Sequence, residues 1–463
     1  MKTIDNATSY KKRLSPILII ILGYLGAIII GTLLIALPVA NTSGNWLNLL
    51  DAFFMATSAV CITGLTVVNT TLSFTIFGQI VLLVLIQIGG LGIMGFSSAI
   101  FLAIRKKLTL SNKLAIQQAV GDMPSFKIAQ YLRYMIVTTV IIEALGTMAL
   151  APAFYKAFGP IGIFKALFIS VSAFCNAGFD VLSYQRDLGS LMGFADNVLV
   201  LLSVSFLIIL GGIGFWVIMD VLTKRKINRL MTHTKIVITA TIALILLGSI
   251  GYLLAEWNNP HTLGNMDTGQ KFLNSFFMAV TPRTSGFYNI NVNNMTSFSK
   301  LLTMLLMFIG ASPASTGGGI KTTTLVILLF MLFSGLKNKE RIVLNKRYIG
   351  TRAMFKAIAV TIIFCILVIF LTMALLLAEQ NNLSLNELGL YTLENLLFET
   401  ISALCTVGLS CSITPYLGIG GKIIIIIAMF LGKIGPLSIG LLIAKKSKAD
   451  EKFRYPEAMI MVG

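Results

Sequence analysis

Apolar residues fill eight long segments of the chain, and short polar connections separate them. Each segment is apolar over about 19 residues or more, and a helix of about 20 residues crosses the hydrocarbon core of a bilayer. The segments are Leu14–Leu37, Ile76–Ile104, Ile128–Ala151, Asn197–Leu222, Ile236–Leu254, Leu301–Leu336, Met354–Leu377 and Lys422–Ala444. The pattern predicts an all-α integral membrane protein with eight transmembrane helices.

A shorter apolar stretch recurs four times between these segments, and each copy ends at a glycine followed by Leu or Phe. Stretches of about 10–14 residues are too short to span and are typical of re-entrant helices. The copies are Phe54–Leu65, Leu167–Phe179, Phe276–Phe287 and Leu397–Leu409. We therefore expect four tandem pore repeats of span, re-entrant pore helix and loop, and span, at residues 14–104, 128–222, 234–336 and 353–444.

The span after each loop carries a second matching motif. The four versions are Ile88-Gly-Gly-Leu-Gly92, Leu210-Gly-Gly-Ile-Gly214, Ile309-Gly-Ala-Ser-Pro313 and Leu431-Gly-Lys-Ile-Gly-Pro436. The first glycine of the motif follows the loop glycine by 25, 33, 24 and 24 residues, so three of the four spacings agree within one residue. We expect Gly89, Gly90, Gly211 and Gly212 to be small residues that let helices approach closely.

Four loops of non-helical backbone at membrane depth require a shared purpose, because such backbone is tolerated only where protein buries it or where it lines a cavity. Loops arranged around one axis can point carbonyl groups inward and replace the hydration shell of a cation. A glycine in each loop permits the required backbone conformation. We therefore predict one pseudo-four-fold pore, whose ion-binding selectivity filter consists of Ile62, Thr63, Gly64, Asn176, Ala177, Gly178, Thr284, Ser285, Gly286, Thr406, Val407 and Gly408.

The third repeat has an interrupted inner helix that suggests a gate. Ten consecutive small or helix-breaking residues, with one proline and several glycines, cannot hold a straight helix. We expect an unwound intramembrane loop beneath the filter, and the alternative is a passive kink. The predicted gate residues are Gly310, Ala311, Ser312, Pro313, Ala314, Ser315, Thr316, Gly317, Gly318 and Gly319, together with Lys433.

Lys433 lies about 11 residues into the last span, near the membrane midplane, where a charge costs at least ~2.5 kcal/mol. We expect its ammonium to face the pore below the filter, where it donates to carbonyls of the loop or acts as an electrostatic barrier. The alternative is a pair with Glu143 or another buried acceptor. We expect Lys321 to extend toward the cytoplasmic side.

The net charge of +18 reflects topology rather than nucleic-acid binding. With eight alternating spans, 27 of the 36 Lys and Arg residues fall on one side. The positive-inside rule then predicts a multi-pass protein of the cell membrane whose tails, 1–13 and 445–463, are both cytoplasmic. The basic loops suit contact with anionic membrane lipid. The five cysteines and two histidines form no metal or catalytic motif, so we expect no enzyme activity and no organic cofactor.

The glycine loops, the glycine-rich break after Ala-Ser-Pro-Ala-Ser-Thr and the Leu-Gly-Lys-Ile-Gly-Pro segment resemble the Trk/Ktr/HKT superfamily of K⁺ transporters, within which the likeness is to KtrB, the bacterial membrane subunit. The likeness runs from Leu14 to Ala444. It implies a channel-like K⁺-uptake protein, often stimulated by Na⁺ as a coupling or activating ion. It also implies a homodimer controlled by a cytosolic nucleotide-binding ring of RCK type, like KtrA.

The resemblance assigns the four filter glycines to Gly64, Gly178, Gly286 and Gly408, a pattern associated with K⁺ preference. The family usually has arginine where this chain has Lys433. The first half of the K⁺-channel filter sequence also stands here, as Thr406-Val407-Gly408. The competing interpretation is an alternating-access cation symporter, which repeated and broken helices also build. It is disfavoured because the repeats are parallel and each loop re-enters from the same side.

Overall fold

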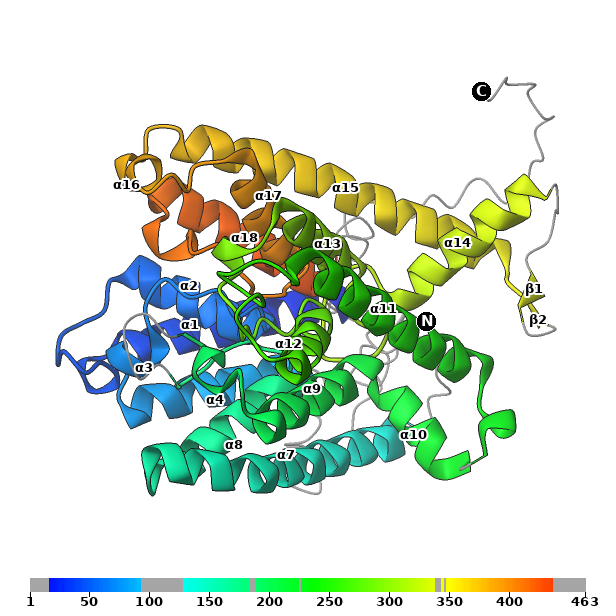
Figure 1. Cartoon of the computed structure of the whole chain (residues 1–463), viewed down its shortest axis with the longest axis horizontal. Helices are drawn as coiled ribbons and strands as arrows, with labels where there is room; N and C mark the ends of the chain where they lie inside the picture. Colours follow the sequence, from blue (N-terminus) through cyan, green and yellow to red (C-terminus); the bar gives the residue numbers. More distant parts are fainter. Residues whose placement is uncertain are drawn as a thin grey trace, which may run out of the picture.

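The computed structural model describes residues 16–92, 128–182, 189–224, 226–337, 343–344 and 347–435. The regular secondary structure of these residues is helical apart from one short hairpin and an isolated bridge between Asn41 and Phe74. The hairpin pairs β1 (Val343–Leu344) with β2 (Arg347–Tyr348) in antiparallel register. Figure 1 shows α3 and α16 at one end of the molecule and α10, α14 and the hairpin at the other. The helical class predicted from the sequence is therefore confirmed for the described residues.

Three kinds of helix follow one another four times along the chain. The long helices are α1 (Pro16–Ala36), α7 (Ile128–Phe158), α11 (Thr232–Glu256) and α15 (Thr351–Glu379). The short helices are α2 (Leu49–Cys61), α8 (Ile161–Phe174), α12 (Thr268–Val280) and α17 (Leu393–Leu404). The inner helices are α4 (Ile76–Leu91), α9 (Val198–Ile213), α13 (Ser297–Ile309) and α18 (Ile419–Ile434).

Shorter elements complete the order. The remaining α-helices are α3 (Thr70–Ser73), α10 (Phe215–Lys224), α14 (Thr322–Leu336) and α16 (Leu383–Glu387). The 3-10 turns are η1 (Pro38–Ala40), η3 (Met192–Phe194), η4 (Ile227–Arg229), η5 (Val292–Asn294) and η6 (Thr414–Tyr416).

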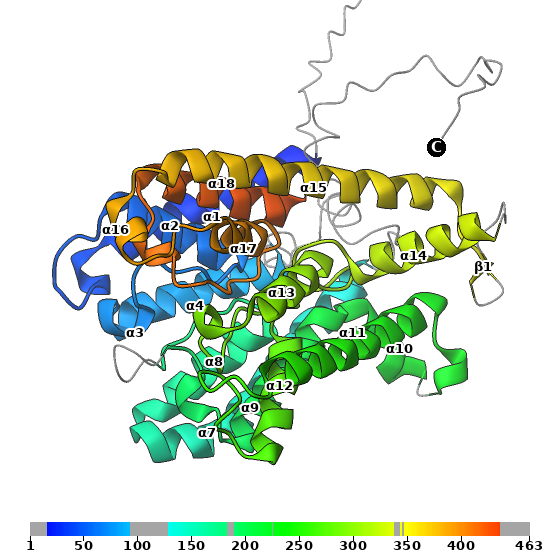
Figure 2. The same cartoon turned by 45° about the horizontal axis from the view of Figure 1, so that its top comes forward.

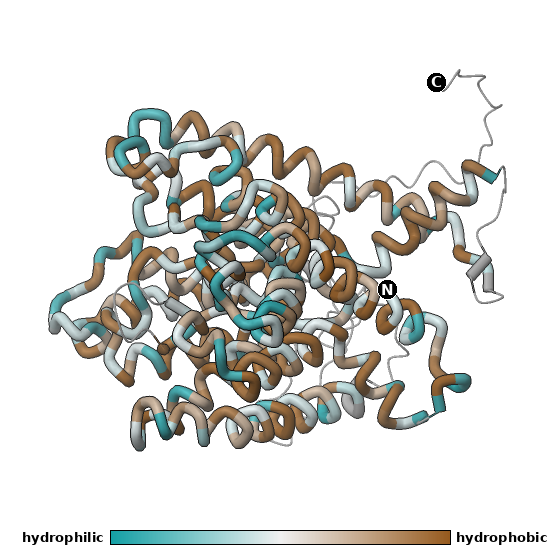
Figure 3. The backbone as a smooth tube through the Cα atoms, in the orientation of Figure 1, coloured by the Kyte–Doolittle hydropathy of each residue, from teal (hydrophilic) through white to brown (hydrophobic). Residues whose placement is uncertain are grey.

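The long helices have the length and composition of membrane spans. The stretches that qualify are Leu18–Ala36, Tyr131–Phe158, Thr232–Glu256 and Thr351–Glu379, and in each no more than 33% of the most apolar window is buried. Large apolar side chains therefore face outward, as Ile30 (61% exposed) and Phe370 (66% exposed) do. In Figure 3 apolar residues follow α15, whereas hydrophilic residues gather at α16. Such a surface is stable in lipid rather than in water, which makes this a multi-pass membrane protein.

One predicted span is not straight. We expected a break only in the third inner helix, but the segment Asn197–Leu222 is also broken, and α9 and α10 meet at an angle of 95°. The cause is Gly214, which has φ +99°, a left-handed conformation that suits glycine. A Cβ on Gly214 would lie 2.6 Å from the carbonyl oxygen of Pro313, so the bend also fits tightly against the third inner segment.

All four inner helices end at a glycine with positive φ. These glycines are Gly92, Gly214, Gly310 and Gly435, with φ of 72°, 99°, 60° and 83°. The predicted continuations toward Ile104 and Ala444 lie outside the described residues. Within those residues, four uninterrupted helices reach spanning length, and the bent pair α9–α10 makes a fifth span if it is counted as one. The eight spans expected from the sequence stay a prediction.

The helices pack in a closed cycle. Each short helix packs against the long helix that precedes it, and each inner helix packs against the short helix of the next set, so that α4 contacts α8, α9 contacts α12, α13 contacts α17 and α18 returns to α2. Figures 1 and 2 show α18 beside α2, although they come from opposite ends of the chain. Polar contacts support three of these junctions: Lys422 Nζ to Asp51 Oδ1 (2.7 Å), Lys300 Nζ to Asn395 Oδ1 (3.4 Å) and Asn274 Nδ2 to the carbonyl of Ala195 (2.9 Å).

Candidate functional site

The loops that follow the four short helices share one unusual backbone conformation. In each loop a residue with a side chain has positive φ, and the glycine two positions later does too. The pairs are Ile62 and Gly64 (56° and 90°), Asn176 and Gly178 (56° and 70°), Thr284 and Gly286 (74° and 79°), and Thr406 and Gly408 (51° and 95°). Non-glycine residues in this region cost on the order of 1 kcal/mol or more each, and persist only where the surroundings enforce them. The loops are therefore four versions of one structure.

The structure brings the glycines of these loops together in a closed ring. Each glycine faces the carbonyl oxygen of the residue before the next glycine, so closely that an added Cβ would lie within 2.6 Å of that oxygen. The pairs are Gly64 with Ala177, Gly178 with Ser285, Gly286 with Val407 and Gly408 with Thr63. A side chain at any of the four glycines would collide with backbone, and the φ values would strain it further. The carbonyl groups of Thr63, Ala177, Ser285 and Val407 therefore converge on one place.

A hydroxyl near the end of each short helix ties its loop down. The amide of Gly64 donates to Ser58 Oγ at 3.1 Å, and the amide of Gly408 donates to Ser402 Oγ at 3.0 Å. In the other two loops the hydroxyl donates instead: Ser172 to the carbonyl of Phe179 at 2.7 Å, and Thr281 to the carbonyl of Phe287. We did not single out these hydroxyls from the sequence. The sequence does mark them, because a Ser or Thr stands three residues after each of four matched positions in the short helices. Those positions are Met55, Ile169, Met278 and Glu399.

Several hydroxyls in the loops have no hydrogen-bond partner. Thr63 Oγ1, Thr284 Oγ1 and Ser285 Oγ are buried and unpaired in the part of the chain that the structure describes. An unsatisfied buried hydroxyl costs about 1–3 kcal/mol, and in a native protein it calls for an explanation such as an ion or water. The loops thus supply both converging carbonyls and free hydroxyl oxygens, which are ligands suited to alkali cations.

The predicted interruption of the third inner helix is present, and it lies against the ring. We call residues 310–321, between α13 and α14, the central loop. An added Cβ on Gly317 would collide with Thr284 Oγ1, and one on Gly318 would collide with Thr406 Oγ1. All ten predicted gate residues from Gly310 to Gly319 therefore belong to an irregular segment that touches two of the four loops.

The central loop is fixed to the bent inner helix α9. The amide of Ser312 donates to the carbonyl of Gly212 at 3.0 Å, and the amide of Phe215 donates to the carbonyl of Ala314 at 3.1 Å. The Thr316 hydroxyl lies 3.0 Å from the side chain of Asn176. The central loop therefore also contacts the loop that follows the second short helix, α8. The bend at Gly214 leaves the carbonyl of Gly212, in α9, and the amide of Phe215, in α10, to bond with the central loop.

Lys321 does not extend toward the cytoplasmic side as we expected. Its Nζ turns back and donates to the carbonyl of Gly317 at 2.7 Å and to that of Gly318 at 3.4 Å. These are acceptors of the kind that we assigned to Lys433. The reason is local, because Lys321 directly follows the unwound residues, whose carbonyls have no helical partner.

Lys433 is half-buried and has neither a hydrogen bond nor an ion pair with any described residue. Lys433 directly follows Gly432 in α18, and at the matching place in α4 Gly89 is followed by a second glycine, Gly90. The fourth inner helix therefore carries an ammonium group where the first has no side chain. Cys61, Lys321 and Cys175 are among the ionisable groups in the neighbourhood of Lys433.

The alternative partner for Lys433, Glu143, is engaged elsewhere. Its carboxylate accepts from Gln87 Nε2 at 3.4 Å and lies 3.9 Å from Cys175 Sγ.

The close packing expected at four glycines of the inner helices is found at Gly89, Gly90 and Gly211 but not at Gly212, where an added Cβ would lie no nearer than 3.6 Å to a neighbouring atom. Added Cβ atoms on Gly89, Gly211 and Gly432 would collide with the carbonyl oxygens of Val60, Phe174 and Leu404. Each of these carbonyls belongs to the last turn of the short helix in the same set. The glycines let the inner helices approach the ends of the short helices and so position the ring.

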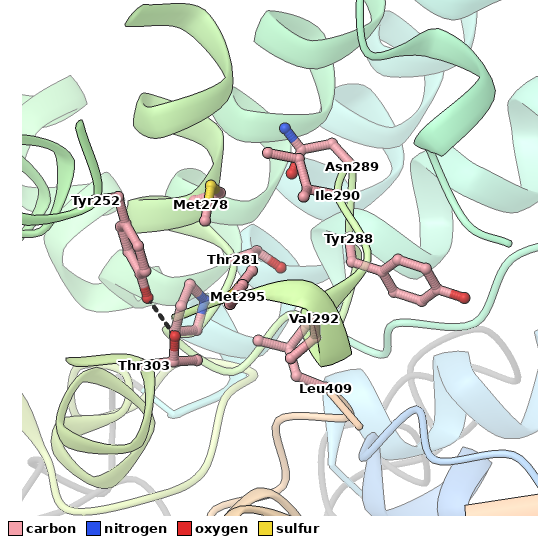
Figure 4. Close-up of a pocket in the computed structure, with 11 residues that line it drawn as sticks. Tyr252, Met278, Thr281, Tyr288, Asn289, Ile290, Val292, Met295, Thr303 and Leu409 are labelled. Atoms are coloured by element: carbon pink, nitrogen blue, oxygen red, sulfur yellow. Dashed lines mark hydrogen bonds between the residues drawn. The ribbon is translucent and has the colours of Figure 1, made fainter. Parts of the chain in front are cut away.

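A small cavity lies behind the third loop (Figure 4). Three of its hydroxyl groups are already paired, since the Tyr252 hydroxyl lies 2.6 Å from Thr303 Oγ1 and Thr281 donates to the carbonyl of Phe287. None of the four ring glycines lines the cavity. Among the described residues, no group of three or more His, Cys, Asp and Glu side chains is placed to hold a metal ion.

Comparisons with known proteins point in the same direction as the geometry. A family model described as TrkH, cation transport protein, matches residues 26–455. Potassium/sodium uptake protein NtpJ of Enterococcus hirae is 36% identical over 457 residues, covering 98% of both chains. Ktr system potassium uptake protein B of Bacillus subtilis is 36% identical over 452 residues, covering 97% of both. The crystal structure of the potassium transporter TrkH from Vibrio parahaemolyticus has the same fold, with a TM-score of 0.71 and 16% identity over 94% of this chain and 86% of that chain.

Proposed function

This chain belongs to the TrkH family of cation transport proteins, and we propose that it mediates K⁺ uptake across the cell membrane as a channel-like pore subunit. The observation that carries the proposal is the closed ring in which the carbonyl groups of Thr63, Ala177, Ser285 and Val407 converge. The names of the relatives, potassium/sodium uptake protein and Ktr system potassium uptake protein B, agree with K⁺ as the transported ion.

The ring is the selectivity filter in this proposal. An alkali ion that enters it loses water, and carbonyl oxygens held at fixed positions replace that water. The unpaired hydroxyls of Thr63, Thr284 and Ser285, which stand on the same loops, add further oxygen ligands. The four sets of long, short and inner helix then act as four pore repeats around one pseudo-four-fold axis.

The central loop is the gate. It lies against Thr284 and Thr406, so an ion that leaves the filter on this side meets it at once. Lys321 holds the central loop in its folded form through Gly317, and its charge together with that of Lys433 repels a cation beneath the filter. Movement of the central loop away from the axis opens the path.

Regulation and assembly follow the family pattern in our proposal. The pore protein forms a homodimer, both termini face the cytoplasm, and a cytosolic RCK-type nucleotide-binding ring, KtrA-like, docks on the basic loops. Na⁺ stimulates transport as a coupling or activating ion. The excess of basic residues, +18 overall, supports a cytoplasmic face that contacts acidic lipid and partner surfaces.

Flux into liposomes tests the function. Purified protein should carry K⁺ and radioactive Rb⁺ into vesicles in preference to Na⁺, and planar-bilayer recordings should show discrete currents. Currents exclude the alternating-access symporter, because a carrier moves too few ions per cycle to produce them. The absence of K⁺ or Rb⁺ flux, with or without added Na⁺, contradicts the proposal.

A further inference from the structure

Glu399 is a fully buried carboxyl on the fourth short helix. Its exposed fraction is 0%, and it lies on α17 between the buried residues Phe398 and Thr400. The matching positions on the other three short helices are apolar: Met55, Ile169 and Met278. A carboxyl at a site where related helices place hydrocarbon is costly and requires a compensating contact.

The compensating contact comes from one hydroxyl, which a second hydroxyl supports. Thr414 Oγ1 donates to Glu399 Oε1. Thr414 Oγ1 in turn lies 3.1 Å from Ser410 Oγ, so the three side chains form one cluster. Glu399 Oε2 has no partner in the described ranges, and neither of the two ion pairs found there includes Glu399.

These hydroxyls lie on the chain that leaves the fourth ring loop. Ser410 comes two residues after Gly408, and Thr414 begins the turn η6. The near side of the same loop is held by Ser402, whose Oγ accepts from the amide of Gly408 at 3.0 Å. The fourth ring loop is thus tied to its short helix, α17, at two points. Ser402 holds the amide of Gly408, and Glu399 holds the residues that follow Gly408.

We propose that Glu399 is a positioning residue that sets the ion preference of the filter. It does so as a hydrogen-bond acceptor that holds the exit of the Thr406-Val407-Gly408 strand against α17. The inference rests on the proposed function, since it assigns a role within the filter. Its physical basis is that discrimination between K⁺ and Na⁺ depends on the placement of the carbonyl cage, and a strand tied at one end only is free to contract around a smaller ion.

The test compares variants of the full-length protein in liposomes by the ratio of Rb⁺ to Na⁺ uptake. Glu399→Met, which copies two of the other short helices, should lower the ratio by about tenfold, and Thr414→Val should lower it in the same direction by removing the donor. Glu399→Gln keeps an acceptor oxygen and should stay within about twofold of the wild-type ratio. Glu394→Gln, on the same helix but outside the cluster, is the matched control and should leave the ratio unchanged.

Each outcome decides the matter. If Glu399→Met does not assemble in the membrane, the ratio for Thr414→Val decides instead. Wild-type ratios in both variants overturn the inference, and so does a loss in Glu399→Gln as large as in Glu399→Met, because the charge would then matter rather than the acceptor. Wild-type protein without any preference for Rb⁺ contradicts the proposed function itself, which separates the two failures.

Discussion

Asp51 and Lys422 lie 371 residues apart in the chain and form an ion pair in which Oδ1 and Nζ are 2.7 Å apart. Asp51 is in the first turn of α2 and Lys422 in the first turn of α18, so the pair joins the first short helix to the last inner helix. This is the junction at which the cycle of helices closes. The side chains are 20% and 16% exposed, which shields the pair from solvent more than a surface salt bridge.

The first prediction is that this ion pair stabilises the closed cycle of helices. Asp51→Lys places two ammonium groups together and should lower the thermal unfolding midpoint in detergent, at a cost of about 1 kcal/mol or more. Adding Lys422→Asp restores opposite charges and should recover most of the loss. If the stability lost in the double variant equals the sum of the losses in the two single variants, the two side chains do not interact and the pairing is contradicted.

The second prediction concerns the ring glycines. Gly64→Ser should weaken the discrimination of K⁺ over Na⁺, because φ is +90° there and an added Cβ would lie 2.5 Å from the carbonyl oxygen of Ala177. The measurement is the ratio of K⁺ to Na⁺ uptake in liposomes. Gly269→Ser is the control, since that glycine lies in the first turn of α12 with nothing within 4 Å of an added Cβ and should leave the ratio unchanged. Equal ratios for both variants count against the filter assignment.

The third prediction concerns the central loop. Deletion of Ala311–Gly317 removes the segment that touches the ring loops and should raise K⁺ flux. Thr316→Val, which removes only the hydroxyl beside Asn176, should raise it less. Flux is measured as Rb⁺ uptake per amount of reconstituted protein. Unchanged flux after the deletion reduces the central loop to a passive kink.

The fourth prediction separates the two lysines. Lys321→Met removes the donor to the carbonyl of Gly317 and should raise flux by loosening the central loop. Lys433→Met should raise flux by removing a charge that has no partner in the described region, and Lys433→Arg keeps the charge and should behave like wild type. Wild-type flux in both methionine variants is the outcome that excludes an electrostatic barrier below the filter.

Much of the site was predictable because repetition leaves a readable pattern. The four glycines stand at matched places in four similar stretches, and the structure brings all four into one ring. The interruption from Gly310 to Gly319 was predictable for a simpler reason, since that composition cannot form a regular helix.

Other features could not be read from the sequence, because residues of one type allow opposite geometries. A lysine at the end of a broken helix can extend toward water or turn back to free carbonyls, and Lys321 does the second. The motif Gly-Gly-Ile-Gly suits close helix packing, yet its last glycine, Gly214, bends the span by 95°. The Asp51–Lys422 pair depends on ring closure, which no local pattern encodes.

An experimental density map of the purified protein in Rb⁺ or Tl⁺ tests the central claim most directly, because both ions replace K⁺ and scatter strongly. We predict ion density on the axis of the ring, bounded by the carbonyl oxygens of Thr63, Ala177, Ser285 and Val407, and its loss when Na⁺ replaces the heavier ion. A map in which these oxygens face lipid or separate crevices, with the ions bound elsewhere, contradicts the account.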